Sequence, residues 1–122
     1  MMAIIDIVDL RVRAIIGTHP FERKNKQELI INISLEYDAT KASRSDDLKD
    51  AVDYECISNA VIKIAENSSC LLLEKLAAKM MDKLKGFKGL QNISLRIDKP
   101  QAIAQARCIS YKITCSLPNP CL

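Results

Sequence analysis

Residues 28–37, ELIINISLEY, carry the most regular hydrophobic pattern of the 122-residue chain. Apolar side chains occupy alternate positions of this segment, at Leu29, Ile31, Ile33, Leu35 and Tyr37. Polar side chains stand between them, at Asn32, Ser34 and Glu36. Successive residues of a strand point to opposite faces of the sheet. The segment is therefore predicted to be a strand with one buried and one solvated face.

The pattern on either side of this segment predicts three more strands and two helices. The strands are expected over residues 4–15, 92–98 and roughly 106–116. Apolar residues at helical spacing predict a helix with Asp53 as its N-cap and a second helix ending at Gly86. Ser68 or Ser69 is the expected cap of that second helix. Residues 17–25 are predicted to form a turn, and residues 39–53 a loop with at most one helical turn.

The resulting order is β-β-α-α-β-β, in one domain over residues 1–122. Strands that come in adjacent pairs favour hairpins, so an α+β fold is expected, with a four-stranded antiparallel sheet and both helices on one face. Such a sheet has two exposed edges, and unprotected edges tend to pair with another chain. Oligomerisation through the sheet edges is therefore expected.

Composition argues against several classes of function. The net charge is +3 with scattered basic residues, and the chain has no Trp, so nucleic-acid binding is not expected. The five cysteines have irregular spacing and form no CxxC pair, which favours reduced thiols and a cytoplasmic location. No apolar run approaches the ~20 residues of a membrane span, and the N-terminus does not look like a signal peptide.

Four residues at element boundaries could carry chemistry. The chain contains one histidine, His19, so a His-based triad or multi-His metal site is excluded. Acid–base groups must then come from Lys, Tyr, Glu or Asp, and the candidates are Glu22, Tyr54, Glu74 and Lys99. Each has an ordinary structural interpretation: Glu22 and Lys99 as solvated charges, Tyr54 as a packed boundary residue, and Glu74 as a carboxylate favoured by the helix dipole. Glu74 is also framed by leucines, which would partly desolvate it.

Four pieces of the chain, in this order and spacing, resemble the dihydroneopterin aldolase family, which includes dihydroneopterin triphosphate 2'-epimerase. They are LRVRAIIGTHPFERKNKQELIINISLEYD, KASRSDDLKDAVDY, LLLEKLA and IDKPQAIAQA. The resemblance covers residues 4 to 116. It implies the tunnelling fold, subunits that join edge to edge into tetrameric rings, and two stacked rings that make a homo-octamer with sites between neighbouring subunits.

The resemblance also implies roles for individual residues. Lys99 matches the general acid–base group, Tyr54 and Glu22 match further catalytic positions, and Glu74 matches the glutamate that anchors the pterin. Leu73 and Val52 match positions whose backbone contacts the substrate. The implied reaction is the retro-aldol cleavage of 7,8-dihydroneopterin in folate biosynthesis, with no cofactor, no metal and no Schiff base. Burial or a cationic neighbour is expected to tune the Lys99 ammonium.

Two alternatives stay open at this point. The basic residues Arg23, Lys24 and Lys26 follow Glu22 and could meet a triphosphate, which would favour the epimerase. A non-catalytic pterin- or purine-binding protein with the same fold is the other alternative, because fold does not determine function. Such a protein would need Glu74 but would have no use for both Lys99 and Tyr54.

Overall fold

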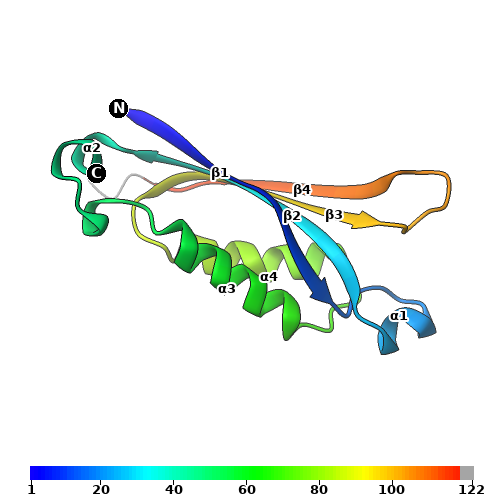
Figure 1. Ribbon diagram of the computed structural model, residues 1–122. Helices are drawn as coiled ribbons and strands as arrows, with labels where there is room; N and C mark the ends of the chain where they lie inside the picture. The colour runs from blue at the N-terminus through cyan, green and yellow to red at the C-terminus, as the bar shows by residue number, and fades with distance from the viewer. Residues whose placement is uncertain (119–122) are drawn as a thin grey trace.

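A four-stranded antiparallel sheet with two long helices on one face makes up the fold of the computed structural model, which describes residues 1–118 (Figure 1). Cys121 and the end of the expected tail lie outside the described residues. The elements are β1 (Met2–Ala14), α1 (Pro20–Lys24), β2 (Gln27–Asp38), α2 (Thr40–Ser45), the 3₁₀ turn η1 (Leu48–Asp50), α3 (Tyr54–Glu66), α4 (Leu73–Lys85), β3 (Leu90–Pro100) and β4 (Cys108–Ser116).

The strands lie in the order β1-β2-β3-β4, so each pairs with its neighbour in sequence. This confirms the predicted α+β class and the antiparallel sheet. β1 and β4 form the two edges. Helices α3 and α4 lie side by side on the same face of the sheet, as expected (Figure 1). Within residues 1–118, every helix is too short or too polar to span a lipid bilayer.

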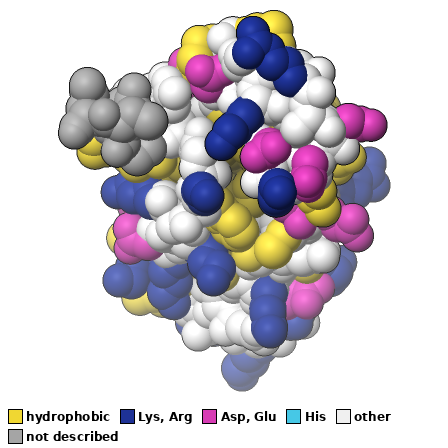
Figure 2. Space-filling model, turned by 90° about the vertical axis from the view of Figure 1, so that its left-hand side faces the viewer, with side chains coloured by type: hydrophobic (Ala, Val, Ile, Leu, Met, Phe, Trp, Pro, Cys, Tyr) yellow, Lys and Arg dark blue, Asp and Glu magenta, His cyan; other side chains and the backbone are white. Residues whose placement is uncertain are grey.

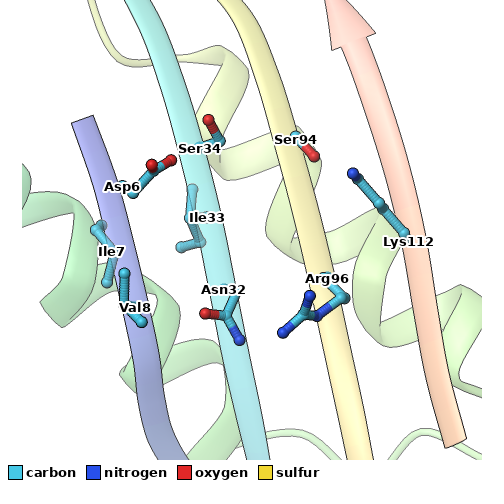
Figure 3. Close-up of a pocket in the computed structure, with 9 residues that line it drawn as sticks. All are labelled: Asp6, Ile7, Val8, Asn32, Ile33, Ser34, Ser94, Arg96 and Lys112. Carbon is cyan, nitrogen blue, oxygen red and sulfur yellow. The ribbon is translucent and has the colours of Figure 1, made fainter. Parts of the chain in front are cut away.

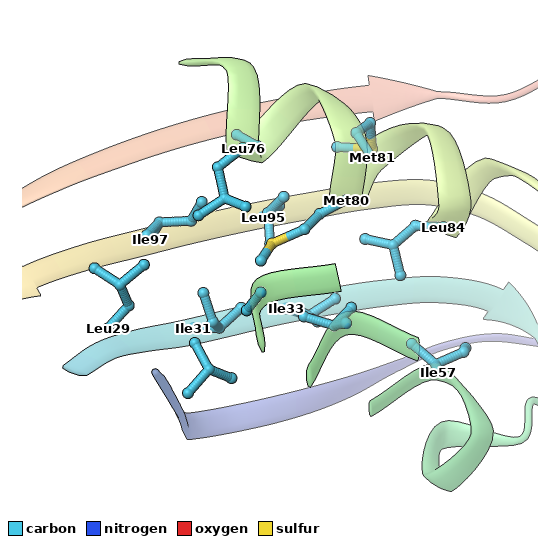
Figure 4. Close-up of a cluster of buried hydrophobic side chains, with 14 of the residues drawn as sticks. Leu29, Ile31, Ile33, Ile57, Leu76, Met80, Met81, Leu84, Leu95 and Ile97 are labelled. Atoms are coloured by element: carbon cyan, nitrogen blue, oxygen red, sulfur yellow. The ribbon is translucent and has the colours of Figure 1, made fainter. Parts of the chain in front are cut away.

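The core fills the space between the sheet and these helices (Figure 4). Four of the alternating residues of β2 face the helices and are buried, from Leu29 to Leu35, whereas Tyr37 is half-buried. Ile93, Leu95 and Ile97 of β3 are also buried. Helix α3 contributes Ile57, Val61 and Ala65, and α4 contributes Leu76, Ala77, Met80 and Leu84. Burying one large aliphatic side chain stabilises a fold by about 1.5–3 kcal/mol. The apolar residues at every second position of the strands and those at helical spacing in α3 and α4 thus meet in one core between the sheet and the helices.

Several predicted boundaries were wrong. The 17–25 turn contains the short helix α1, and the 39–53 loop contains both α2 and η1. Neither Ser68 nor Ser69 caps α4, whose N-cap is Leu72. Asp53 does cap α3, because its side chain accepts a hydrogen bond from the Cys56 backbone N–H. Strand β3 runs on to Pro100, so Lys99 lies within the strand.

Strand β1 contains an irregularity that the pattern analysis did not predict. Its pairing with β2 shifts between Ile7 and Leu10, and Asp9 takes a positive φ of 55°. The Asn32 amide holds this bulge by accepting from the Asp9 N–H at 2.9 Å. A bulge reverses the facing of the residues beyond it. Residues on both sides of the bulge can thus face the helices.

The other face of the sheet is open and mostly polar. A shallow hollow of about 250 Å³ lies there, lined by Asp6, Ile7, Val8, Asn32, Ile33, Ser34, Ser94, Arg96 and Lys112 (Figure 3). None of the predicted site residues lines it. At the end of the molecule that carries α2 and the start of α3, side chains of both charges are interspersed around exposed hydrophobic ones (Figure 2). Leu48 and Tyr54 are exposed hydrophobic residues of these segments.

Candidate functional site

Lys99 occupies the place where the buried face of β3 extends beyond the helices. It lies two residues after Ile97, on the same face of the strand, and pairs across to Ile109 of β4. Pro100 follows it and ends β3, which restricts the backbone of Lys99 to an extended conformation. The Lys99 side chain is only 14% exposed. The alternative of a solvated lysine is therefore wrong.

Glu22 is the partner of Lys99. The two side chains form an ion pair in which Lys99 Nζ lies 2.6 Å from Glu22 Oε2, and the Glu22 side chain is 15% exposed. Oε2 also accepts from Gln27 Nε2 at 2.9 Å, and Oε1 accepts from the His19 N–H at 3.2 Å. The interpretation of Glu22 as a solvated loop acid is wrong. Of the two influences expected to tune Lys99, the structure shows burial, whereas its charged neighbour is a carboxylate and not a cation.

Gly17 makes room for this carboxylate. A Cβ at Gly17 would lie 2.2 Å from Glu22 Cδ, which is far closer than atoms can approach. Gly17 also has a φ of +116°, a backbone conformation that residues with a Cβ atom rarely adopt. Glu22 itself is the third residue of α1, so its carboxylate can turn back to the His19 N–H that precedes the helix. Gly17 therefore leaves the space for the Glu22 carboxylate, and α1 orients this carboxylate toward Lys99.

These contacts hold the pKa of Glu22 at about 2, down from 4.5. The largest cause is the hydrogen bond from Lys99, followed by that from Gln27; partial burial opposes them. Glu22 is therefore a carboxylate throughout the neutral range. It can orient a water or a substrate hydroxyl by accepting a hydrogen bond, and it holds the Lys99 ammonium in one position.

Glu22→Gln should reduce stability in a pH-dependent way. The depressed pKa stabilises the folded chain above pH 4.5, and this contribution is lost as the pH falls toward 2. The shift corresponds to at most about 3 kcal/mol of unfolding free energy, and solvent screening of the pair lowers this figure. Denaturant unfolding should therefore show a gap between wild type and variant at pH 6 that closes in acid. Glu28→Gln, which removes an exposed carboxylate from the same region, is the control. A gap of equal size at pH 6 and pH 3 would contradict the ion pair.

A cleft of about 660 Å³ opens beside Glu22. Its lining residues are Arg13, His19, Phe21, Glu22, Lys26, Gln27, Glu28, Pro100, Gln101 and Ala102. Arg13 comes from β1, Glu22 from α1, and Gln27 and Glu28 from β2. The remaining wall is formed by Pro100 at the end of β3 and by the two residues that follow it. The cleft can thus hold a small polar molecule against the carboxylate that is paired with Lys99.

Glu74 and Leu73 lie in the first turn of α4, at the same end of the molecule as α1 (Figure 1). Leu73 is half-buried, whereas Glu74 is exposed. The expected desolvation of Glu74 by leucines is wrong within one chain, because Leu71 and Leu72 are themselves 54% and 52% exposed. Within residues 1–118, no hydrogen bond or ion pair engages the Glu74 carboxylate, so it offers two acceptor oxygens at the start of a helix.

Tyr54 and Val52 lie elsewhere. Tyr54 is the first residue of α3 and is 59% exposed, and Val52 just before it is buried. The opposite end of α3 leads into the loop that precedes α4. A helix of 13 residues is about 20 Å long at 1.5 Å per residue. One chain therefore brings Glu22 and Lys99 into contact but leaves Tyr54 at the far end of the helical layer.

Sequence reasoning missed Gln27 and Gly17 as supports of Glu22. Gly17 lies five residues before Glu22 and gave a weak signal that another group approaches the backbone closely there. The sequence gave no signal for Gln27. Among residues 1–118, no three His, Cys, Asp or Glu side chains come together in a way that could hold a metal ion.

The sheet, the helical layer and the Glu22–Lys99 pair together define an α+β protein of the tunnelling-fold class. The profile of dihydroneopterin aldolase matches residues 5–114, so the chain belongs to the dihydroneopterin aldolase family. It is 34% identical over 112 residues to dihydroneopterin triphosphate 2'-epimerase of Escherichia coli K12, covering 92% of this chain and 93% of that protein. It is 33% identical over 107 residues to dihydroneopterin aldolase of Haemophilus influenzae, covering 88% and 91%.

A solved structure shares the fold. The structure of E. coli dihydroneopterin aldolase in complex with neopterin matches with a TM-score of 0.87 and 28% identity, covering 93% of this chain and 99% of that one. A uricase from Bacillus fastidious matches at 10% identity with a TM-score of 0.63, which shows likeness of fold alone. The family is thus established by sequence, while its relatives carry two different activities in their names.

Proposed function

We propose that this chain is a dihydroneopterin aldolase of folate biosynthesis. It would cleave the C1'–C2' bond of 7,8-dihydroneopterin and release glycolaldehyde and 6-hydroxymethyl-7,8-dihydropterin. The observation that carries this proposal is the Lys99–Glu22 pair at 2.6 Å beside a 660 Å³ cleft, in a chain of this family. The complex of the E. coli relative with neopterin supports a pterin as the ligand.

The chemistry needs proton transfers and an electron sink. The 2'-hydroxyl loses its proton as the C1'–C2' bond breaks, and its oxygen becomes the carbonyl of glycolaldehyde. The bonding electrons flow into the pterin ring through its imine, protonated at N5, and C1' then takes up a proton. Because the ring is its own sink, the reaction as proposed needs neither a Schiff base nor a metal ion.

Each predicted residue has a part in this proposal. Lys99 delivers and accepts protons, and Glu22 orients it and the reacting water. Glu74 binds the 2-amino group and N3–H of the pterin, a planar pair of donors that matches a carboxylate. The Leu73 backbone contacts the ring, and a neighbouring chain contributes the Val52 backbone and the Tyr54 hydroxyl.

Assembly of several copies is part of the proposal. The outer edges of β1 and β4 are open, and β1 exposes Met2, Ile4 and Val8. Pairing β1 of one copy with β4 of the next would extend the antiparallel sheet and close a ring. We propose tetrameric rings stacked as an octamer, in which Tyr54 of one chain approaches the Glu22–Lys99 pair of another.

The 2'-epimerase is the second candidate, and a specific observation favours it. Arg13, His19 and Lys26 line the cleft beside Glu22, so basic side chains stand where a phosphorylated substrate would extend. Of Arg23, Lys24 and Lys26, which the sequence left as possible contacts of a triphosphate, only Lys26 lines the cleft. Epimerisation shares the retro-aldol step. The aldehyde fragment, which carries the triphosphate, then rotates, and C1' adds to the opposite face of its carbonyl before release.

Substrate charge separates the two activities. The aldolase should process dihydroneopterin with a kcat/KM that is nearly indifferent to salt, because that substrate is neutral. An enzyme for the triphosphate should lose its advantage as the Debye length falls from ~10 Å at 0.1 M to ~3 Å at 1 M salt. The measurement is kcat/KM for both substrates at both salt concentrations. The aldehyde released, which is glycolaldehyde from dihydroneopterin and its triphosphate from the other substrate, is quantified together with the 2'-epimer.

Two matched variants sharpen this test. Lys26→Gln should change the salt dependence only if a phosphate enters the cleft, whereas Lys24→Gln, on the exposed side of α1, should not. A preference for the triphosphate above about tenfold, together with epimer exceeding cleavage product, would reject the aldolase in favour of the epimerase.

A further inference from the structure

Arg23 joins two loops that are far apart in the sequence. Its Nη1 donates to the Gly17 carbonyl at 3.0 Å and to the Cys70 carbonyl at 3.1 Å. Its Nη2 donates to the Ser69 carbonyl at 2.6 Å. The planar guanidinium thus presents two nitrogens to three fixed acceptors, which a lysine ammonium could not reproduce with the same geometry.

These carbonyls depend on Arg23. Within residues 1–118, no backbone N–H donates to any of the three. The segment that contains Glu22 also needs polar support, because α1 has five residues and none of them is buried. Hydrophobic packing therefore does not hold α1 in place. Arg23 and the contacts of Glu22 do.

The two loops carry the two halves of the proposed site. Gly17 and Arg23 flank the segment that presents Glu22 to Lys99. Ser69 and Cys70 lie just before α4, whose first two residues are Leu73 and Glu74. One side chain therefore ties the acid–base pair to the start of the helix that would hold the pterin ring.

We propose that Arg23 is a positioning residue that sets the separation between the Glu22–Lys99 pair and Glu74. This inference rests on the proposed function of that site. It also gives Arg23 a role other than the triphosphate contact that the sequence left open, since its guanidinium donates to backbone carbonyls. Without the guanidinium, α1 and the start of α4 would move independently, so a ring held by Glu74 would no longer align with Lys99.

The test compares Arg23→Ala with Lys24→Ala, which removes the same charge from the exposed neighbouring position of α1. Misplacement by about 1 Å can cost 10²-fold in rate. Arg23→Ala should therefore lower kcat about 10- to 100-fold while KM changes by less than about threefold, because Glu74 and α4 are intact. Millimolar guanidinium chloride should restore part of kcat in this variant, and the same concentration of sodium chloride should not.

Arg23→Lys is the second variant, for the case in which the alanine variant folds poorly. It keeps the charge and most of the stem but cannot hold both loops, so its kcat should fall as well. The proposal is overturned if Arg23→Lys retains wild-type kcat. It is also overturned if Arg23→Ala has the same kcat as Lys24→Ala, or if guanidinium chloride does not restore part of the kcat of Arg23→Ala.

Amide hydrogen exchange gives a readout that does not depend on activity. In Arg23→Ala, exchange in residues 17–25 and 67–73 should quicken by about tenfold or more, the factor for one lost hydrogen bond to a charged group. Lys24→Ala should leave both segments unchanged. If the wild-type protein turns over no pterin, the proposed function is rejected. The exchange rates would still show whether Arg23 holds the two loops together. Equal exchange in the two variants would overturn the proposal.

Discussion

Replacing Lys99 with alanine is expected to lower kcat by about 10²-fold or more, the range for a lost general acid–base group. Affinity for the product pterin should stay within about tenfold, because Glu74 lies on α4 and does not contact Lys99 in one chain. Steady-state glycolaldehyde release and titration with 6-hydroxymethyl-7,8-dihydropterin measure the two quantities. Lys112→Ala, on the open face of the adjacent strand, is the matched control.

The fall in kcat of Lys99→Ala must be distinguished from the effect of leaving the Glu22 carboxylate without its partner. Lys99→Ala leaves Glu22 mostly buried without its cation, which also destabilises the fold. The double variant Lys99→Ala/Glu22→Gln removes that charge, so its stability should recover while its kcat stays low. Turnover close to wild type in either variant would reject Lys99 as the acid–base group. A wild-type chain that binds neopterin but neither releases glycolaldehyde nor forms a 2'-epimer would instead be a binding protein.

Mixing two inactive variants should restore activity. Tyr54→Phe and Lys99→Ala each remove one group that, in the proposed ring, comes from a different chain to the same site. The length of α3 separates these residues within one chain, so neither variant can complete its own site. With random exchange at equal concentrations, about a quarter of the interfaces would pair an intact Tyr54 with an intact Lys99.

The mixture should therefore reach about a quarter of the wild-type rate, provided that subunits exchange. Exchange is checked by native mass spectrometry of differently labelled chains, and the same measurement reports the number of subunits. The double variant Tyr54→Phe/Lys99→Ala, mixed with wild type, shows how far dilution alone lowers the rate. Continued inactivity of the mixture after full exchange would show that sites are not shared in this way.

The sheet was predictable because its pattern is redundant. In β2 every second residue is apolar, so one register alone buries the whole set, and β3 repeats the pattern up to Ile97. The same period places Lys99 on the helix-covered face. The sequence could not show that Lys99 stays inside the strand, since Pro100 pairs across to Cys108 at its very end.

The bulge in β1 is encoded in the sequence by a break in the alternation of apolar residues. Apolar residues occupy positions 5 and 7 and then positions 10, 12 and 14, so the alternation changes parity at Asp9. In a regular strand without a bulge, one of these two sets of apolar side chains would face the solvent. The inserted residue restores both groups to the covered face, at the cost of a positive φ at Asp9.

The partners within the site were less predictable for physical reasons. Glu22 finds Lys99 across 77 positions of the chain, and no local pattern encodes that distance. Helix α1 starts with His19 and Pro20, and histidine is not among the common N-caps, so the return of Glu22 to the His19 N–H gave no clear sequence signal. The exposure of Glu74 depends on the rotation of α4, which Leu76 and Met80 determine by packing.

The close approach of Glu22 to Gly17 has a consequence for sorting relatives of this chain. Position 17 combines a positive φ with a carboxylate in the space that a Cβ would fill, so no other residue type fits there without moving the acid. A relative that keeps the equivalents of Glu22 and Lys99 but has a larger residue in place of Gly17 would carry both charged groups without bringing them together. Gly17 is thus a sharper marker of an assembled site than the acid or the lysine alone.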